Sequence, residues 1–314
     1  KYKIVSDKTI DVNDLTKLFG DEVAVKDLSF EVEEGEVLGF VGPNGAGKST
    51  TINAMLGFIK PSSGSVKMFD MDINKRPRKI KKRIGVVPED YELYQNRTGI
   101  EHIQMAARAK GEDINPQDVV DRVGLTEDES KRNVSGYSTG MKQRLILGMA
   151  LIGDPDLLIL DEPGNGLDPN GIRKLQEIIN QVSNDGVSVF FSSHILSNIE
   201  TVCDKIVVLN RGQEEFSGSI EKLRKEVGQR KEMTVEYSGG DADSVDIDSL
   251  NGVIESEVYD NGEIEVVYER QISVQDIIEE ILESDFRIDS INTKEQSLSE
   301  LFGEITTREE GDIQ

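Results

Sequence analysis

Tryptophan is absent from this chain of 314 residues, aromatic residues make up only 5% of it, and there is a single cysteine. That residue, Cys203, has no second cysteine with which to form an internal disulfide, which is typical of proteins in reducing compartments. Its position just before an apolar run favours a small buried side chain over a reactive or metal-binding thiol. We therefore expect a fold held together without disulfides.

Long hydrophobic runs are also missing. The longest apolar stretches, such as residues 157–160 and 206–209, have the length of strands, whereas a membrane-spanning helix needs about 18–20 apolar residues. Residues 1–10 mix polar and apolar side chains and contain no apolar signal core. The sequence predicts a globular cytosolic chain that reaches a membrane only through a partner.

Positive charge is outnumbered, since 36 Lys and Arg residues face 60 Asp and Glu residues and the chain carries a net charge of −24. Residues 230–314 hold 24 acidic and 6 basic residues, a net charge of −18, which leaves −6 for the residues before them. Nucleic acid is disfavoured as a partner, because phosphate binding needs a basic face. Adaptation to high salt and a single acidic domain both explain this balance.

Strands and helices alternate over most of the chain, which predicts an α/β fold with a mainly parallel sheet. Residues 97–152 differ, because they contain helical patterns and no convincing strand. We expect an α/β core over residues 1–228 with a helical insertion at about 90–152. Residues 229–314 read as a small α+β domain with strands near 233–237, 253–258 and 263–268 and a helix near 274–282.

A glycine-rich loop lies between an apolar strand predicted over residues 37–41 and a helix predicted over 51–57. Glycines let backbone N–H groups turn toward a phosphate, and the helix N-terminus adds a favourable dipole. Lys48 would neutralise phosphate charge, and Ser49 would offer its hydroxyl to Mg²⁺. The pattern predicts a nucleotide-binding P-loop made of Gly42, Pro43, Asn44, Gly45, Ala46, Gly47, Lys48, Ser49 and Thr50.

Two carboxylates, Asp161 and Glu162, directly follow the apolar residues 157–160. In a parallel sheet both would emerge at the edge where the P-loop also lies. Asp161 suits a ligand of Mg²⁺ or its water, and Glu162 suits the residue that orients or deprotonates the attacking water. A solvated acidic strand end is the alternative, and the upstream P-loop favours the catalytic interpretation.

With these motifs in order, the chain resembles an ABC ATPase over about residues 12–223. Residues 137–144 resemble the family's signature segment, usually written LSGGQ, although Tyr137, Thr139 and Met141 depart from it. The segment opens a helix, whose N-terminus can face an anion. The resemblance implies that the γ-phosphate bound by a second subunit is contacted by Ser138, Thr139, Gly140 and Met141.

The resemblance assigns further positions. Phe19 would stack on adenine, with a core phenylalanine as the alternative. Glu89 stands where the family usually has glutamine and would contact Mg²⁺ together with Ser49 and Asp161. His194 would hydrogen-bond the γ-phosphate as the switch histidine and, with Glu162 and Lys48, serve catalysis.

The D-loop, which crosses the dimer interface, would comprise Gly166, Leu167 and Asp168. His102 matches no motif, so a structural or surface role is expected for it.

The family resemblance implies a function for the whole chain. It predicts a P-loop ATPase with an antiparallel β subdomain beside the parallel sheet, using ATP and Mg²⁺. A chain with one P-loop and one signature needs a second nucleotide-binding subunit, as a homodimer or with another ABC ATPase. The groove between core and insertion would contact transmembrane permease subunits and transmit the movement to them. This contact would place the chain at the inner face of the cell membrane. Residues 295–302 resemble the tails of drug, lipid and copper-processing exporters.

Other classes of ABC protein fit less well. Translation factors usually carry two ATPase cores, whereas this chain has one P-loop. Chromosome and repair types insert long coiled coils, and here about 110 residues without heptads separate the P-loop from Asp161. A nucleotide-responsive regulatory module not coupled to transport stays open.

One feature belongs to none of these motifs. Residues 75–83 contain seven positive side chains in nine positions. A solvated connector face and a contact with anionic lipid headgroups are the two interpretations.

Overall fold

The computed structural model describes residues 8–226, 230–239, 247–259, 261–269, 272–283 and 287–295. The chain divides into two compact units, Lys1–Ile220 and Glu221–Gln314. The expected boundary at residues 228 and 229 and most of the exporter-like tail at 295–302 lie outside the described residues.

A six-stranded sheet forms the centre of the first unit, in the order β10-β9-β3-β8-β7-β6. Its strands are β3 (Val37–Val41), β6 (Ile84–Val87), β7 (Leu157–Leu160), β8 (Ser188–Ser193), β9 (Lys205–Asn210) and β10 (Gln213–Ser219). All neighbours are parallel except β9 and β10. Every residue of β3, β7 and β8 is buried, as in parallel sheets covered on both faces. The α/β expectation is confirmed, while β10 was not anticipated.

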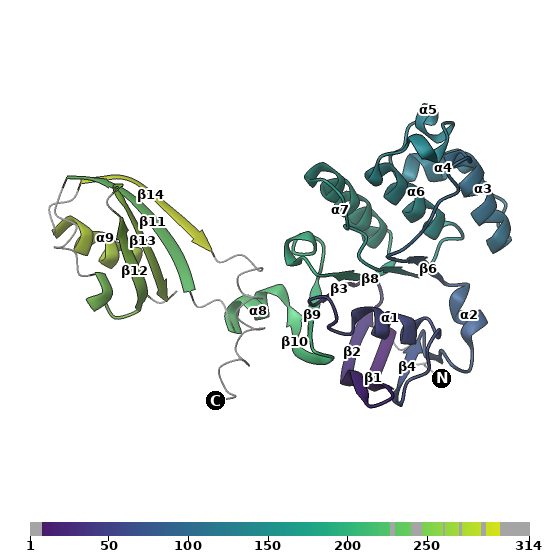
Figure 1. The fold of residues 1–314 in the computed structure, drawn as a ribbon, viewed down its shortest axis with the longest axis horizontal. Coiled ribbons are helices and arrows are strands. Elements are labelled where there is room, and N and C mark those ends of the chain that lie inside the picture. Colours follow the sequence, from purple (N-terminus) through teal and green to yellow (C-terminus); the bar gives the residue numbers. More distant parts are fainter. Residues whose placement is uncertain are drawn as a thin grey trace, which may run out of the picture. The chain divides into compact units, whose positions relative to one another are not determined.

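An antiparallel sheet packs beside the central one. It contains β1 (Lys8–Phe19), β2 (Glu22–Glu33), β4 (Ser63–Met68) and β5 (Met71–Asp72), in the order β2-β1-β4-β5. Phe30 of β2, Phe40 of β3 and Phe190 of β8 contact one another, with the three pairs of ring centroids 5.1–5.9 Å apart. These rings and helix α1 (Lys48–Met55), also buried, join the two sheets into one hydrophobic core (Figure 1).

The helical insertion follows β6. It consists of α3 (Gly99–Lys110), α4 (Pro116–Arg122), α5 (Glu127–Ser130), the short turn η1 (Val134–Gly136) and α6 (Thr139–Leu151), which gather beside β6 in Figure 1. Thr98 and Glu101 form a reciprocal capping box at the start of α3, and Gly111 ends it at φ 77°. The first unit also contains α2 (Pro77–Lys81), α7 (Pro169–Asn184) and η2 (Leu196–Asn198).

The second unit begins with α8 (Ile220–Glu226) and continues as a four-stranded antiparallel sheet with one packed helix. Its elements are β11 (Arg230–Ser238), η4 (Ile247–Ser249), β12 (Val253–Tyr259), β13 (Glu263–Glu269), α9 (Val274–Glu283) and β14 (Arg287–Glu295), with sheet order β12-β13-β11-β14. Strands β12 and β13 form the expected hairpin, with Tyr259 opposite Glu263. Ile277 and Ile281 of α9 enter its core.

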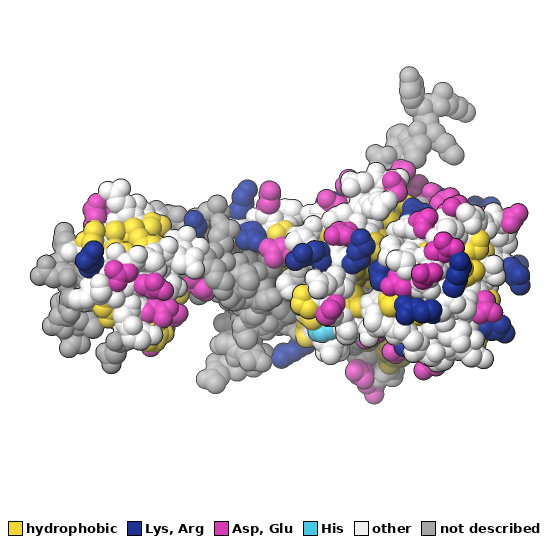
Figure 2. All heavy atoms as spheres, turned by 90° about the horizontal axis from the view of Figure 1, so that it is seen from above, with side chains coloured by type: hydrophobic (Ala, Val, Ile, Leu, Met, Phe, Trp, Pro, Cys, Tyr) yellow, Lys and Arg dark blue, Asp and Glu magenta, His cyan; other side chains and the backbone are white. Residues whose placement is uncertain are grey.

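Charge and hydrophobicity are distributed as in a globular protein. Figure 2 shows acidic and basic side chains interspersed over the visible face of the first unit. Among the described residues, no helix is long and apolar enough to cross a membrane.

Candidate active site

The P-loop wraps around the start of α1. Gly47 caps that helix at φ 101°, and a Cβ there would lie 2.6 Å from the carbonyl oxygen of Ala24. Only glycine fits both the left-handed backbone and this close approach. Gly45 also has a positive φ of 83°. The loop thereby presents its backbone to an anion at the helix N-terminus, as the motif requires.

Lys48, the first residue of α1, is buried and turns toward two kinds of oxygen. Its Nζ donates to the carbonyl oxygen of Gly42 at 2.7 Å and lies 3.3 Å from that of Pro43. It also lies 3.1 Å from Glu162 Oε1, in an ion pair without hydrogen-bond alignment. The predicted phosphate-binding lysine and the predicted catalytic carboxylate are therefore in direct contact, although 114 positions separate them in the sequence.

Glu162 is held from its other side by His194, the predicted switch histidine. Its Oε2 lies 2.8 Å from His194 Nδ1 and accepts from the His194 backbone N–H at 3.2 Å. Glu162 has a φ of 47°, an uncommon conformation for a residue other than glycine. This bend at the end of β7 directs the carboxylate toward Lys48 and His194, so these three side chains form one cluster.

Ser192 links the two carboxylates and was not assigned a role from the sequence. Its hydroxyl donates to Asp161 Oδ1 at 2.6 Å and accepts from the Glu162 backbone N–H at 2.9 Å. Strands β7 and β8 are parallel neighbours, with Leu160 opposite Phe191, so Asp161, directly after β7, meets Ser192 near the end of β8. A serine two residues before the predicted switch histidine, His194, was the only signal available.

Burial and neighbouring negative charges disfavour the ionised forms of Asp161 and Glu89 at the site. Burial raises the pKa of Asp161, and the hydrogen bond from Ser192 only partly offsets it. Desolvation also raises the pKa of Glu89, with the nearby negative charges of Asp161 and Glu162 adding to the shift. Several carboxylates crowd a small volume, which favours binding of a compensating cation.

A cavity of about 540 Å³ opens at the P-loop. Phe19, at the end of β1, contributes a ring that is 50% exposed and has Lys17 Nζ 4.8 Å from its centre. An exposed ring at a cavity mouth suits stacking on a planar base and contradicts the alternative of a core phenylalanine. The cavity is lined by Phe19, Glu22, Val23, Ala24, Asn44, Gly45, Gly47, Lys48, Ser49, Thr50, Glu89, Glu162 and Arg211.

Comparisons with known proteins agree with this geometry. Residues 25–165 match the family model described as ABC transporter. Residues 218–306 match the model described as ATP-binding protein DrrA1-3-like, C-terminal domain. The chain is 32% identical to the bacitracin transport ATP-binding protein BcrA of Enterococcus faecalis, over 96% of this chain and 97% of that protein. The chain belongs to the ABC transporter ATP-binding proteins.

Two further likenesses support the assignment. The linearmycin resistance ATP-binding protein LnrL of Bacillus subtilis is 32% identical over 95% of this chain and 98% of its own. A solved structure described as the ATP binding subunit of an ABC transporter superposes with a TM-score of 0.62 and 30% identity, covering 69% of this chain and 92% of that one. This ABC ATPase therefore binds and hydrolyses ATP.

The proposed Mg²⁺ ligands fall on two neighbouring cavities. Ser49 and Glu89 line the P-loop cavity of this ABC ATPase, whereas Asp161 lines a second cavity described below. In the described part of the chain, no group of three or more His, Cys, Asp and Glu side chains could hold a metal alone. Hydroxyl and carboxylate oxygens, which Ser49, Glu89 and Asp161 supply, are the donors that Mg²⁺ prefers.

The signature segment lies elsewhere. Ser138 caps α6, where its hydroxyl accepts from the Met141 N–H at 3.2 Å, and both Ser138 and Thr139 are exposed. Among the described residues, none of the four signature residues lines the P-loop cavity. Tyr137 is buried instead and donates to the carbonyl oxygen of Glu129 at 2.6 Å. Its departure from leucine therefore anchors the segment to α5.

The D-loop lies against the signature. A Cβ at Gly166 would be 3.6 Å from Thr139 Cγ2, and one at Gly140 would be 3.9 Å from Leu167 Cδ2. Asp168 caps α7 by accepting from the Gly171 N–H at 2.8 Å. The two predicted interface motifs thus share one exposed surface of this ABC ATPase.

The two remaining residues of interest have structural settings. His102 is buried, with Nε2 accepting from the Tyr94 N–H at 3.0 Å and Nδ1 2.8 Å from the carbonyl oxygen of Thr98. It therefore holds the segment before α3 in place. Cys203 is a free thiol, and burial raises its pKa strongly.

Proposed function

We propose that this ABC ATPase acts as a dimer, with a second copy or another ABC ATPase subunit, and closes on two Mg·ATP. Each ATP would lie between the P-loop of one subunit and the signature of the other. The observation that carries the proposal is the exposure of Ser138 and Thr139 at the start of the signature, which lies outside its own chain's nucleotide cavity. A helix N-terminus on an open surface is suited to a phosphate supplied by a partner.

Each residue of the cluster has a task in this dimer. Lys48 would exchange Glu162 and the loop carbonyls for the β- and γ-phosphates, and Phe19 would stack on the base. Glu162, once released by Lys48, would orient and deprotonate water, with His194 fixing its carboxylate. Mg²⁺, held by Ser49, Glu89 and Asp161, would neutralise developing charge on the phosphates.

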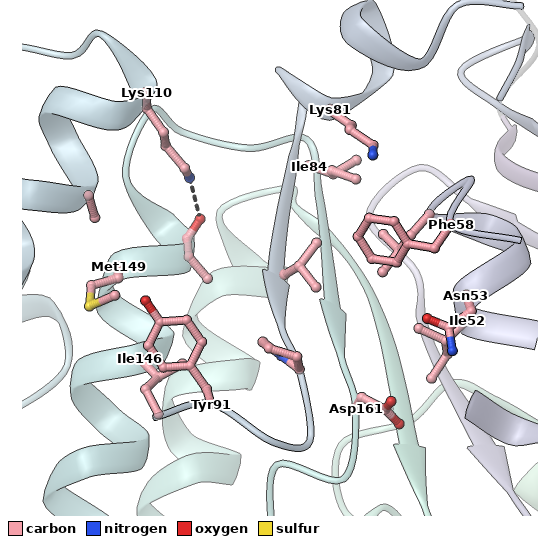
Figure 3. A pocket seen from close by; sticks show the side chains of 15 residues that line it. Ile52, Asn53, Phe58, Lys81, Ile84, Tyr91, Lys110, Ile146, Met149 and Asp161 are labelled. Carbon is pink, nitrogen blue, oxygen red and sulfur yellow. Dashed lines mark hydrogen bonds between the residues drawn. The ribbon is translucent and has the colours of Figure 1, made fainter. Parts of the chain in front are cut away.

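Closure would move separate transmembrane subunits, which would dock in a groove of about 440 Å³ between the core and the helical insertion. Phe58 after α1, Tyr91 after β6, and Ile146 and Met149 of α6 point into it in Figure 3. Phe58 is 67% and Tyr91 44% exposed. Exposed aromatic rings in an apolar groove favour an inserted helix or loop of a partner.

Asp161 connects this groove to the chemistry. It lines the groove (Figure 3) and accepts from Ser192, which in turn contacts the Glu162 backbone. A partner segment seated in the groove would thus lie beside the carboxylate that follows β7. This arrangement supports coupling of membrane movement to ATP hydrolysis at the inner face of the cell membrane.

Export is the direction we propose. BcrA and LnrL are named for bacitracin transport and linearmycin resistance, and both align with this chain over at least 95% of its length. The alignment includes the second unit, which also matches a DrrA-type C-terminal model. The transported compound would be selected by the membrane subunits.

A complementation experiment tests the composite site. The variant S138R keeps its P-loop but loses its signature, and K48A keeps its signature but loses its P-loop. Each variant by itself is expected to have an ATPase activity at least about a hundredfold lower than wild type. Mixed in equal amounts, they should regain part of the wild-type rate, because one intact composite site forms per mixed dimer.

Two outcomes would contradict the dimer. S138R alone could hydrolyse ATP at the wild-type rate, which would place the whole reaction in one chain. The mixture could also stay inactive although sedimentation shows that mixed dimers form. A mixture of K48A with K48A/S138R, which contains no intact composite site, serves as the matched control.

A further inference from the structure

The basic run at residues 75–83 becomes a defined surface in the structure. It comprises α2 with its flanks, and each of its seven cations is exposed. Three of them have partners within the chain. Lys75 pairs with Asp72 at 3.4 Å, Arg83 with Asp156 at 2.6 Å, and Lys81 Nζ lies 4.6 Å from the centre of the Phe58 ring.

The other four cations are Arg76, Arg78, Lys79 and Lys82. Across the described residues, none of these four side chains makes an ion pair, hydrogen bond or ring contact. These four charges stay available to an external anion, whereas Arg83 is already paired with Asp156. Four unpaired cations on one short helical segment repel each other, which is offset when an anionic surface approaches.

This surface exists in a strongly acidic protein. The chain carries −24, but −18 of it falls on residues 230–314, and the charges at residues 70–83 are seven basic and two acidic. At physiological ionic strength, charges are screened over about 8 Å. The local excess of positive charge therefore governs what α2 meets at close range.

The position of α2 suggests which anion it meets. Lys81 of α2 and Ile84 of β6 both line the groove proposed to receive the membrane subunits, with Lys81 at its rim in Figure 3. A segment from a membrane protein that enters this groove brings the bilayer surface to the same side. The orientation of α2 toward the bilayer rests on the function proposed above.

We propose that Arg76, Arg78, Lys79 and Lys82 bind the headgroups of anionic phospholipids beside the membrane subunits. Lys75, Lys81 and Arg83 contribute the remaining charge of this α2 surface. Guanidinium and ammonium groups bind phosphodiesters through charge-assisted hydrogen bonds and need no fixed pocket. The α2 surface thereby orients the ATPase so that the groove faces the membrane.

Vesicle binding by the purified full chain tests this proposal. Sedimentation is measured with vesicles of phosphatidylcholine alone and with vesicles that contain phosphatidylglycerol, at low and at physiological salt. The wild-type chain should bind the anionic vesicles more tightly and lose binding as salt rises. Each cation near an anionic surface contributes about fivefold to partitioning, so R76Q/R78Q/K79Q/K82Q should bind at least about tenfold more weakly.

The matched control is K131Q/R132Q/R173Q/K174Q, which removes the same charge from exposed positions on other elements. It should bind vesicles like wild type, and both variants should keep the wild-type basal ATPase rate, which shows that they are folded. Equal loss in both variants, or equal binding of wild type to neutral and anionic vesicles, would overturn the proposal. Tighter binding per charge to polyglutamate than to anionic vesicles would point to an acidic protein segment instead.

These outcomes are independent of the dimer. Vesicle binding needs neither ATP nor the signature, and the complementation of S138R with K48A needs no lipid. Failure of one experiment therefore leaves the other interpretable.

Discussion

Lys48 and Glu162 form a buried ion pair across the nucleotide site, with 3.1 Å between Nζ and Oε1 and each side chain only 6% exposed. The lysine that should hold phosphate and the carboxylate that should activate water thus neutralise each other. ATP would compete with Glu162 for Lys48, so binding and activation of the carboxylate would be linked.

The first prediction concerns the stability of this pair without nucleotide. K48M leaves the Glu162 carboxylate buried without its cation and should lower the free energy of unfolding by about 3 kcal/mol. E162Q should lower the free energy of unfolding by less, because Lys48 Nζ still donates to the carbonyl oxygens of Gly42 and Pro43. The double variant K48M/E162Q should be more stable than the sum of both losses predicts. Urea unfolding of the four proteins measures this, and strictly additive losses would refute the coupling.

The second prediction concerns turnover. E162Q keeps the shape of the side chain but removes the base, so hydrolysis should fall by about 10²- to 10⁴-fold while ATP binding persists. With Mg·ATP the variant should accumulate as a closed dimer. Phosphate release and light scattering measure the two effects. Turnover at the wild-type rate would show that Glu162 is not the base.

The third prediction concerns Glu89, which lines the P-loop cavity where the family has glutamine. Its negative charge would face the phosphates of a bound ATP, so E89Q should strengthen ATP binding about fivefold when EDTA removes Mg²⁺. The gain should shrink with Mg²⁺ present, since the cation already screens the carboxylate. Titration with a fluorescent ATP analogue in both buffers tests this, and unchanged affinity in EDTA would place Glu89 away from the phosphates.

The fourth prediction concerns pH and the capping box of α3. Hydrogen bonding from the Thr98 backbone N–H, and then from Arg97, lowers the pKa of Glu101 from its ordinary 4.5. The ionised carboxylate is therefore favoured in the folded chain. Its contribution to stability is present above pH 4.5 and is lost as the pH falls through the lowered pKa of the folded state. E101A should be less stable than wild type at pH 7, and the difference should vanish in acid.

Urea unfolding at pH 7 and at steps below pH 4.5 measures that difference. T98A is the control, because it removes a hydroxyl cap worth about 1 kcal/mol that does not titrate. Its loss relative to wild type should persist in acid. An E101A difference that stays constant with pH would mean that packing, and not the charged cap, stabilises the start of α3.

Features encoded by adjacent residues could be read directly. The P-loop, the apolar strand ahead of Asp161 and the caps of α3 at Thr98 and Gly111 each depend on contacts within a few positions. Such contacts follow from backbone geometry and local hydrogen bonding, so motif and spacing suffice. The nucleotide site, its family and the α/β class were therefore predictable.

Features decided by strand pairing could not be predicted from the sequence. Parallel pairing of β7 with β8 brings Ser192 against Asp161 and the Glu162 backbone, and His194 against the Glu162 carboxylate. The same packing turns Asp161 toward the groove and leaves Ser138 outside the cavity of its own chain. Chain order alone does not specify such long-range register, because it is selected by burial of whole strands in the common core. The sequence by itself thus determined which residues are candidates for the chemistry, and the tertiary structure decided which of them meet within one chain and which lie apart.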